Sequence, residues 1–382
     1  MNQRKILFVD HTAVMGGAEL CLEDLAKAYT DSSAVVLFED GVLRQRLQAS
    51  NLNVSVAPAA KSMLDLRTSS GLRSLRSIPE LWRLATYISH KSADYDLILA
   101  NSQKAFVVSA LAAFQGNTPL CWYLHDIITA RHFSKINRLV AVFLANRFAS
   151  RVITNSQATT REFEAAGGKK NLCRVVYNGF DANRFDSVSE GSVAQIRSQL
   201  GIGDAPLIGL FSRLSYWKGQ HILLEAVQNL PHAHIMLVGT ALFGESEYVS
   251  QLQELASAPE LAGRVHWMGF RDDIPILMKA CDIVVHTSTE PEPFGRVIVE
   301  GQLAQKPVIA SAAGGALELI RDGINGYLFP PQNATKLSET IERLINDREL
   351  ARTIAQQGYQ DAKTNFSLSS ILTSFQQAIA TI

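Results

Sequence analysis

Cysteine is scarce in this sequence. The chain of 382 residues contains four cysteines, Cys21, Cys121, Cys173 and Cys281, which lie far apart and form no CxxC pair. Disulfide frameworks and structural zinc sites need clustered cysteines, so neither is indicated. The pattern fits a reducing compartment.

Long apolar runs are missing as well. The longest candidate begins at Leu139 and is interrupted by Asn146 and Arg147, whereas a membrane span needs about 18 apolar residues. The apolar run near the N-terminus is too short for the core of a signal peptide and ends at Asp10. We expect a soluble cytoplasmic protein, with peripheral attachment to the inner face of the membrane as an option.

Two common ligand-binding motifs are also missing. No Asp-x-Asp pair lies in a credible metal site, because Asp272 and Asp273 are adjacent, and Asp94 and Asp96 lie at the entry of a predicted strand. The first glycine-rich turn does not have the GxGxxG pattern of dinucleotide-binding folds. We expect no catalytic metal and no other cofactor.

Charge is unevenly distributed although the formal net charge is zero. Residues 1–184 contain 22 Lys and Arg against 15 Asp and Glu, and residues 185–382 contain 14 against 21. The segment 61–91 concentrates six basic residues, interleaved with Leu, Ile and Trp82. An anionic membrane surface would complement this segment, and a domain helix with solvated charges is the alternative. We expect no nucleic-acid partner.

Short apolar runs alternate with longer amphipathic segments, twice along the chain. The runs predict strands at 5–10, 34–38, 54–57, 97–101, 120–125, 151–156, 173–178, 207–212, 234–239, 264–269, 282–288, 307–311 and 326–329. This alternation is typical of α/β proteins with parallel sheets. The predicted fold is two facing, doubly wound Rossmann-like domains with a central cleft.

The domain limits follow from a polar stretch in the middle of the chain. Residues 178–195 show no strong periodicity and form the predicted linker. We expect an acceptor-side domain over 1–185, a donor-binding domain over 186–365 and a final amphipathic helix over 366–382. A return of this helix to the N-terminal domain is one option.

Two strand–loop–helix segments in the second half carry charges where α/β folds bind ligands. In the first, Glu292 lies in an acidic loop, Phe294 and Gly295 lie at the turn into a helix, and Glu300 lies within that helix. Backbone N–H groups at the turn suit a phosphate or sugar oxygen, and the carboxylates suit sugar and ribose hydroxyls. A solvated acidic loop that caps the helix is the alternative.

Two cations, two glycines and a histidine are further candidate site residues. Arg213 and Lys218 lie in the loop of the second segment, where two positive charges could clamp a diphosphate; ordinary surface charges are the alternative. In the first half, Gly16 and Gly17 form a turn that would let a diphosphate approach the backbone. His125 follows a strand and could assist proton transfer, although a lone histidine is more often structural.

Together these segments resemble glycosyltransferase family 4, retaining enzymes of the GT-B architecture, over nearly the whole chain. RLSYWKG is similar to the diphosphate-binding segment of that family, and EPFGRVIVE to its paired-glutamate segment. The resemblance implies that Arg213 and Lys218 bind the diphosphate, Glu292 the donor sugar and Glu300 the ribose. It implies that the Phe294–Gly295 backbone contacts sugar and phosphate.

The resemblance also covers the first glycine turn, His125 and the loop around Arg271. After Gly239 the family often shows a glycine-rich turn, whereas the next glycine here, Gly244, comes later. The predicted catalytic residues are His125, Arg213, Lys218 and Glu292. The predicted donor-binding residues are Gly16, Gly17, Arg213, Lys218, Gly239, Arg271, Glu292, Phe294, Gly295, Arg296 and Glu300.

The predicted function is a retaining, metal-independent transfer of a hexose from a nucleotide diphosphate sugar, such as a UDP-sugar or GDP-sugar. The resemblance implies same-face attack, with the departing phosphate taking the acceptor proton. Glu292 is assigned a positioning role, because glycoside hydrolysis would require a second carboxylic acid. The expected acceptor is a glycan or lipid-linked sugar in cell-surface polysaccharide or glycolipid assembly. A nucleotide-sugar epimerase or phosphorylase of the same fold, and a silent sugar-nucleotide-binding protein, are the alternatives.

Overall fold

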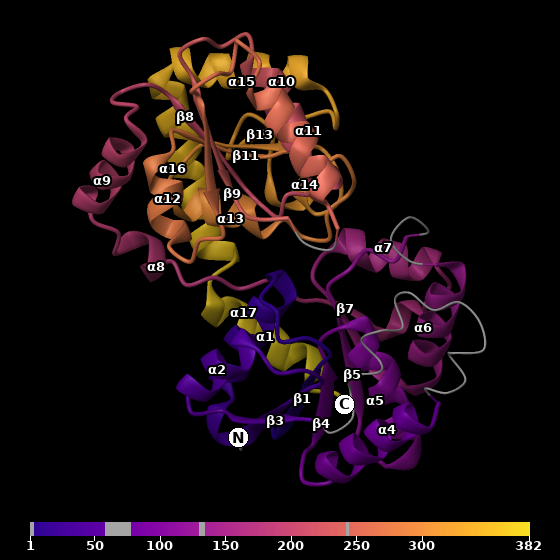
Figure 1. Cartoon of the computed structure of the whole chain (residues 1–382). Coiled ribbons are helices and arrows are strands. Elements are labelled where there is room, and N and C mark those ends of the chain that lie inside the picture. Colours follow the sequence, from indigo (N-terminus) through magenta and orange to yellow (C-terminus); the bar gives the residue numbers. More distant parts are fainter. Residues whose placement is uncertain (1–3, 58–77, 130–133, 242–243) are drawn as a thin grey trace. The chain divides into compact units, whose positions relative to one another are not determined.

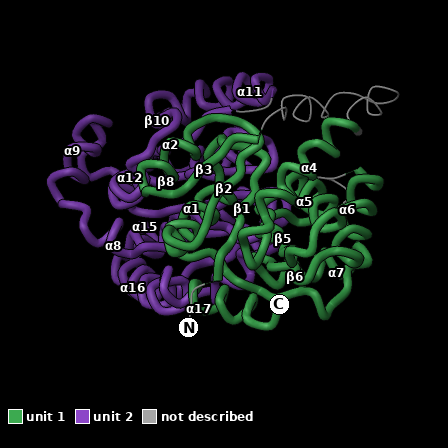
Figure 2. Tube along the Cα trace, turned by 90° about the horizontal axis from the view of Figure 1, so that it is seen from below, with its two compact units in different colours: residues 1–179, 371–382 green, residues 180–370 purple. Residues whose placement is uncertain are grey.

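The computed structural model describes residues 4–57, 78–129, 134–241 and 244–382. Figure 2 shows that the chain divides into two compact units, residues 1–179 with 371–382, and residues 180–370. Each unit contains one parallel sheet and its own helices (Figure 1). Residues 61–77 of the predicted basic segment lie outside the described residues.

Unit 1 is built on a seven-stranded parallel sheet in the order β3-β2-β1-β4-β5-β6-β7. The strands are β1 (Ile6–Asp10), β2 (Ser33–Leu37), β3 (Asn53–Val56), β4 (Leu97–Ala100), β5 (Leu120–Leu124), β6 (Ala149–Thr154) and β7 (Cys173–Val175). The helices are α1 (Gly17–Ala28), α2 (Val42–Ala49), α4 (Ile78–Ser92), α5 (Gln103–Gln115), α6 (Lys135–Phe148), α7 (Gln157–Ala165) and α17 (Leu368–Ile379), of which residues 371–379 belong to unit 1.

Unit 2 repeats this plan with six strands in the order β10-β9-β8-β11-β12-β13. The strands are β8 (Leu207–Phe211), β9 (His234–Val238), β10 (Val265–Gly269), β11 (Ile283–His286), β12 (Val308–Ser311) and β13 (Tyr327–Phe329). The helices are α8 (Asn183–Asp186), α9 (Glu190–Leu200), α10 (Gln220–Val227), α11 (Ser246–Ala256), α12 (Ile274–Ala280), α13 (Arg296–Leu303), α14 (Ala316–Leu319), α15 (Ala334–Asn346) and α16 (Arg348–Asn365).

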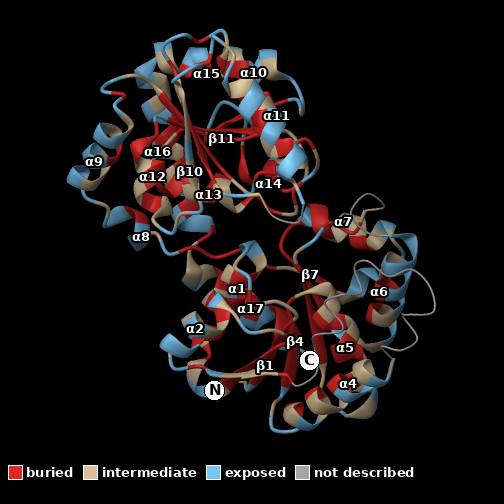
Figure 3. Cartoon of the chain, in the orientation of Figure 1, coloured by how far each residue is buried: buried red, intermediate tan, exposed pale blue. Residues whose placement is uncertain are grey.

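The central strands are apolar on both faces, as parallel strands covered by helices must be. Every residue of β1, β2, β4, β5 and β8 is buried (Figure 3). Alternate side chains of β1 enter different clusters: Leu7 and Val9 pack on one face of the sheet, and Ile6 and Phe8 on the other. All thirteen predicted strands are confirmed within a few residues, and so is the doubly wound parallel arrangement.

The C-terminal helix completes the core of unit 1. Phe375 of α17 is fully buried and meets the ring of Tyr29, at the end of α1, edge to face at 6.0 Å. Arg4 donates a hydrogen bond to the carbonyl of Ile382 at 2.9 Å, and Arg151 donates one to the Thr381 hydroxyl at 2.7 Å. Figure 1 shows α17 beside α1.

The predicted linker 178–195 differs from the structure. It contains α8 and the beginning of α9, and the division between the units falls at Phe180 rather than near residue 185. Phe180 belongs to unit 2 because its N–H donates to the Phe366 carbonyl at 2.9 Å and its ring stacks on Phe294. Ser189 caps α9 by accepting a hydrogen bond from the N–H of Ser192, which begins a helix in a stretch without apolar periodicity.

Among the described residues, no helix is long and apolar enough to cross a bilayer.

Candidate functional site

Each sheet has one place where its strand order reverses, between β1 and β4 in unit 1 and between β8 and β11 in unit 2. Open α/β sheets bind ligands beyond the carboxyl ends of the strands at this place. In unit 2 the loops that follow these two strands are residues 212–219 and 287–295. Arg213, Lys218 and Glu292 lie in them, so the topology brings the two predicted donor segments to one edge of the sheet.

An ion pair between Lys218 and Glu292 joins the two loops. The Lys218 ammonium donates a hydrogen bond to Oε1 of Glu292, although the residues are 74 positions apart in sequence. The Ser288 hydroxyl donates to the same oxygen at 3.0 Å, and Nε2 of His286 lies 3.6 Å from it. Burial alone would raise the pKa of Glu292, but Lys218 and His286 outweigh it and hold that pKa well below its usual range. Glu292 is therefore a buried, ionised carboxylate.

Backbone contacts fix the position of Lys218. Its carbonyl accepts a hydrogen bond from the Thr287 hydroxyl at 2.8 Å, and the Trp217 carbonyl accepts one from the N–H of Thr289 at 2.8 Å. Gly219 has a φ of +69° and packs so closely that a Cβ there would lie 2.1 Å from the Thr287 oxygen. The loop that carries Lys218 is thus held against the loop that carries Glu292.

Trp217 relates the two predicted cations to each other. The Lys218 ammonium lies 4.0 Å from the centre of the Trp217 ring and the Arg213 guanidinium 5.9 Å from it, so both cations can interact with the indole. The buried Gln220 side chain donates a hydrogen bond to the Arg213 carbonyl at 2.7 Å. This bond ties the loop that carries Arg213 to the start of α10. Two positive charges grouped in this way suit a diphosphate.

A glycine pair holds the other side of the Glu292 loop. Gly315 donates its N–H to the Glu292 carbonyl at 2.8 Å. At Gly314, where φ is +61°, a Cβ would lie 2.2 Å from the same oxygen. Sequence reasoning assigned no site role to Gly314, Gly315, His286 or Ser288. The adjacent glycines after a buried strand were the available signal.

The paired-glutamate segment has the predicted local structure. Gly295, with a φ of +96°, precedes α13, which begins at Arg296. The Phe294 side chain is 2% exposed and packs against Phe180 and Phe366. Only its backbone is therefore suited to touch a ligand. Glu300 lies within α13, and its carboxylate is 3.5 Å from the Arg296 guanidinium.

Gly239 and Arg271 lie in the loops that follow β9 and β10. Gly239 has a φ of +135°, and a Cβ there would lie 2.0 Å from the Ser212 carbonyl oxygen. Arg271 donates two hydrogen bonds to the Asp273 carboxylate, at 2.7 and 2.5 Å. The structure thus gives both residues structural contacts, and their contacts with a donor remain predictions.

In unit 1, Asn101 connects His125 to the end of β1. Oδ1 of Asn101 lies 2.9 Å from Nε2 of His125, and its amide nitrogen donates to Asp10 at 2.6 Å and to the Ala18 carbonyl at 3.2 Å. An amide oxygen only accepts hydrogen bonds, so His125 donates from Nε2 in this contact. The sequence signal for Asn101 and Asp10 was a polar residue at the carboxyl end of a buried strand.

Glu19 lies next to the predicted glycine turn. Its carboxylate folds back over the turn, and a Cβ on Gly16 would lie 2.7 Å from it. The backbone of Gly16 is extended, and this contact is with the end of a flexible side chain, so a larger residue here would only need to displace the Glu19 carboxylate. Burial, together with the charge of Asp10, raises the pKa of Glu19 to about 8. Gly17 is the first residue of α1 and is exposed.

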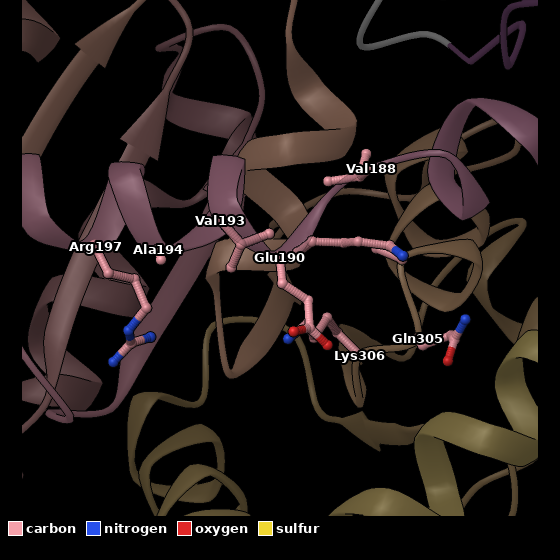
Figure 4. Close-up of a pocket in the computed structure, with 9 residues that line it drawn as sticks. Val188, Glu190, Val193, Ala194, Arg197, Gln305 and Lys306 are labelled. Atoms are coloured by element: carbon pink, nitrogen blue, oxygen red, sulfur yellow. The ribbon is translucent and has the colours of Figure 1, made fainter.

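A separate pocket of about 450 Å³ lies at the opposite edge of the sheet in unit 2 (Figure 4). It is lined by Val188, Glu190, Val193, Ala194, Arg197, Lys279, Ala304, Gln305 and Lys306. Residues 304–306 directly precede β12, so this pocket faces the amino ends of the strands. As the structure describes it, none of the predicted donor residues lines it, and it is not part of the candidate site.

Two family models match consecutive parts of the chain. The model of glycosyltransferase family 4 matches residues 15–184, and the model of group 1 glycosyl transferases matches residues 192–361. The crystal structure of Anabaena HepE in complex with UDP-glucose is 43% identical, covers 100% of both chains and has a TM-score of 0.91.

Curated relatives match over part of their length. The lipopolysaccharide core biosynthesis glycosyltransferase LpsE of Rhizobium meliloti is 29% identical over 60% of this chain and 64% of its own. Spore coat protein SA of Bacillus subtilis is 31% identical over 55% of this chain and 58% of its own. The matched regions thus span less than two thirds of these relatives.

The segments that resemble the family lie within the matched regions, and the Gly16–Gly17 turn, the Lys218 loop and the Glu292 loop follow strands at the switch points of the two sheets. The chain belongs to the family 4 glycosyltransferases, which have the GT-B architecture.

Proposed function

We propose that the protein is a retaining, metal-independent hexosyltransferase that uses a UDP-hexose. The observation that carries the proposal is the buried Lys218–Glu292 pair at the switch point of unit 2. It occurs in a chain that is 43% identical over its full length to HepE, whose structure holds UDP-glucose. UDP-glucose is accordingly the first donor to test.

The proposed reaction depends on charged side chains that are already in position before the donor bond breaks. As the bond between the anomeric carbon and the diphosphate breaks, negative charge grows on the leaving group, where Arg213 and Lys218 would stabilise it. The ionised Glu292 accepts hydrogen bonds from sugar hydroxyls and stabilises positive charge at the anomeric carbon. Glu300 binds the ribose hydroxyls. The acceptor oxygen bonds to the anomeric carbon on the face that the diphosphate leaves, and its proton passes to the departing phosphate.

The proposed acceptor is a glycan or lipid-linked sugar in the assembly of cell-surface polysaccharide or glycolipid. The name of LpsE, a lipopolysaccharide core biosynthesis glycosyltransferase, supports this class of acceptor. The alternatives predict different products. An epimerase would convert the donor without an acceptor, a phosphorylase would require phosphate, and a silent binding protein would bind the donor without releasing UDP.

The test is a screen of the purified protein against UDP-, GDP- and ADP-hexoses, with and without EDTA. We expect thermal stabilisation by UDP-hexoses and slow release of UDP that persists in EDTA. Proton NMR of the product of an accepted sugar should show the same anomeric configuration as the donor. Turnover that requires an added divalent cation, or inversion at the anomeric carbon, would contradict the proposal.

A further inference from the structure

A second pocket in unit 2 adjoins the pocket shown in Figure 4. It has a volume of about 630 Å³, and both pockets are lined by Val193, Arg197, Lys279, Gln305 and Lys306. Most of its other lining residues lie at the beginnings of β8, β11 and β12, or on α15 and α16. We call the two adjoining pockets together the amino-edge site. Volumes of this size suit a small organic ligand.

Positive charge dominates the lining of the amino-edge site. Among the residues that the structure describes, its cations are Arg197, Lys279, Lys306, Arg348 and Arg352, and its carboxylates are Glu190, Asp204 and Asp282. Five positive charges against three negative ones leave a formal net charge of +2. A phosphate monoester carries a charge of about −1.5 to −2 at neutral pH, so one such group would balance the lining.

One cation and one carboxylate of the site are already used by the protein. The Arg197 guanidinium donates hydrogen bonds to the carbonyls of Ala205 at 2.6 Å and Ala280 at 2.9 Å. It also donates to the Asp282 carboxylate at 3.1 Å, and the same carboxylate oxygen accepts the N–H of Leu207 at 2.8 Å. This pair therefore holds together the segments that precede β8 and β11.

Four cations of the site are not engaged in this way: Lys279, Lys306, Arg348 and Arg352. In the part of the chain that the structure describes, their side chains form no hydrogen bond and no ion pair. Burial lowers the pKa of Lys306, and the charges of Arg197 and Lys279 lower it further. Asp282 acts in the opposite direction but is paired with Arg197. A bound anion would offset the repulsion between these neighbouring cations.

Gln305 adds a neutral polar group at a position where helices commonly end on glycine. The N–H groups of Gln305 and Lys306 donate to the carbonyls of Gln302 and Gly301, which is the Schellman pattern after α13. Gln305 has a φ of +59°, a conformation that glycine adopts without strain. Figure 4 shows Gln305 at the same pocket as Glu190 of α9. Amides and carboxylates both accept hydrogen bonds from hydroxyl groups.

We propose that the amino-edge site binds a phosphorylated sugar. Lys279 and Lys306, which line both pockets, bind the phosphate. The sugar extends into the pocket of Figure 4, where the Glu190 carboxylate and the Gln305 amide bind its hydroxyl groups.

The second pocket supplies two further contacts for the phosphate. Arg348 and Arg352 line this pocket alone and lie four positions apart on α16, so both guanidinium groups are on one side of the helix. Guanidinium groups bind phosphate oxygens in pairs. The arrangement therefore places the phosphate toward α16 and the sugar toward α9.

This ligand is distinct from the donor of the proposed transferase. The amino-edge site lies at the amino ends of β8, β11 and β12, whereas Lys218 and Glu292 lie in loops beyond the carboxyl ends of β8 and β11. A phosphorylated sugar and a nucleotide sugar would thus occupy opposite edges of one sheet. The two ligands should bind without competition.

The test is isothermal titration calorimetry of the whole protein with glucose 6-phosphate, inorganic phosphate and glucose. Saturating UDP is present throughout, so that the titrant does not enter the proposed donor site. We expect binding of glucose 6-phosphate, weaker binding of inorganic phosphate and no binding of glucose. Lys279→Gln with Lys306→Gln should raise the Kd of glucose 6-phosphate at least about tenfold, because charge-assisted hydrogen bonds to the phosphate are lost.

A second pair, Arg348→Gln with Arg352→Gln, tests the same site at exposed positions and should also raise this Kd. The matched control is Lys336→Gln, which lines neither pocket and should leave the Kd unchanged. Unfolding temperatures verify that the variants are folded.

Four outcomes would overturn the proposal: no binding by the wild type, an unchanged Kd in both double variants, equal Kd values for inorganic phosphate and glucose 6-phosphate, or displacement of glucose 6-phosphate by UDP-glucose. Lys218→Ala should impair the proposed transfer and leave the binding of glucose 6-phosphate unchanged. This variant separates failure of the phosphorylated-sugar site from failure of the proposed function.

Discussion

Glu292 is buried and ionised at the same time, and the Lys218 ammonium makes this combination stable. Glu292→Gln keeps the shape of the side chain and removes its charge. We expect turnover with a UDP-hexose to fall about 10²- to 10³-fold, as for the loss of one preorganised electrostatic contact, with a smaller change in KM. Steady-state kinetics would measure both. Glu339→Gln, at an exposed position of the same unit, serves as the control.

Asn101 contacts His125 through a hydrogen bond, and we expect it to affect turnover by positioning that histidine. If so, its effect requires the histidine. We expect Asn101→Ala to lower turnover, and Asn101→Ala in a His125→Ala background to have little further effect. A double-mutant cycle in kcat/KM measures this coupling. Additive losses would contradict a role of Asn101 that depends on His125.

Glu19 should make the stability of unit 1 depend on pH. Its folded pKa of about 8 lies above that of an unfolded glutamate, about 4.3, so the folded state binds more protons between these values. The stability associated with Glu19 is complete below pH of about 4.3 and is lost as the pH rises through 8. Glu19→Gln cannot ionise, so its unfolding temperature relative to wild type should rise between pH 5 and 8.5. A constant difference across that range would contradict this.

At the scale of elements, the fit between two loops determines where Lys218 lies. Gly219 and Gly201 both have positive φ values, +69° and +66°, but only Gly219 packs against backbone. Gly201→Ala should lower the free energy of unfolding by about 1–2 kcal/mol, because alanine disfavours the left-handed conformation. Gly219→Ala would add a clash between the new Cβ and the Thr287 oxygen. It should therefore lower the free energy of unfolding, measured in urea, by more than Gly201→Ala does. It should also reduce turnover, which Gly201→Ala should leave unchanged.

The central strands could be predicted from the sequence because each is buried on both faces and forms a continuous apolar run. The linker could not, since α9 begins at a cap formed by Ser189, α8 is only four residues long, and the stretch lacks apolar periodicity. The placement of Lys218 and Glu292 beyond strand ends could likewise be predicted. Their pairing across 74 residues could not, because it depends on β8 and β11 being neighbours in the sheet.

At the scale of the whole molecule, the two units should differ in their response to loss of the core contacts that α17 makes in unit 1. Phe375 is fully buried in unit 1, so Phe375→Ala should cost about 3–5 kcal/mol there. Hydrogen exchange should show lower protection in β1, β4 and β5 and unchanged protection in β8 and β11. Phe270→Ala, at a position of unit 2 that is 63% exposed, is the control. Equal loss in both units would show that they unfold as one.

The same helix has a consequence for synthesis on the ribosome. Domains commonly fold in order as they emerge, beginning at the N-terminus. Here residues 4–179 emerge first but lack Ile371, Phe375 and Ile379, which fill one face of their sheet. The whole of unit 2 must be translated before these side chains arrive. The nascent N-terminal unit therefore carries an unfilled apolar face while its partner is made, and the second unit can complete its fold before the first.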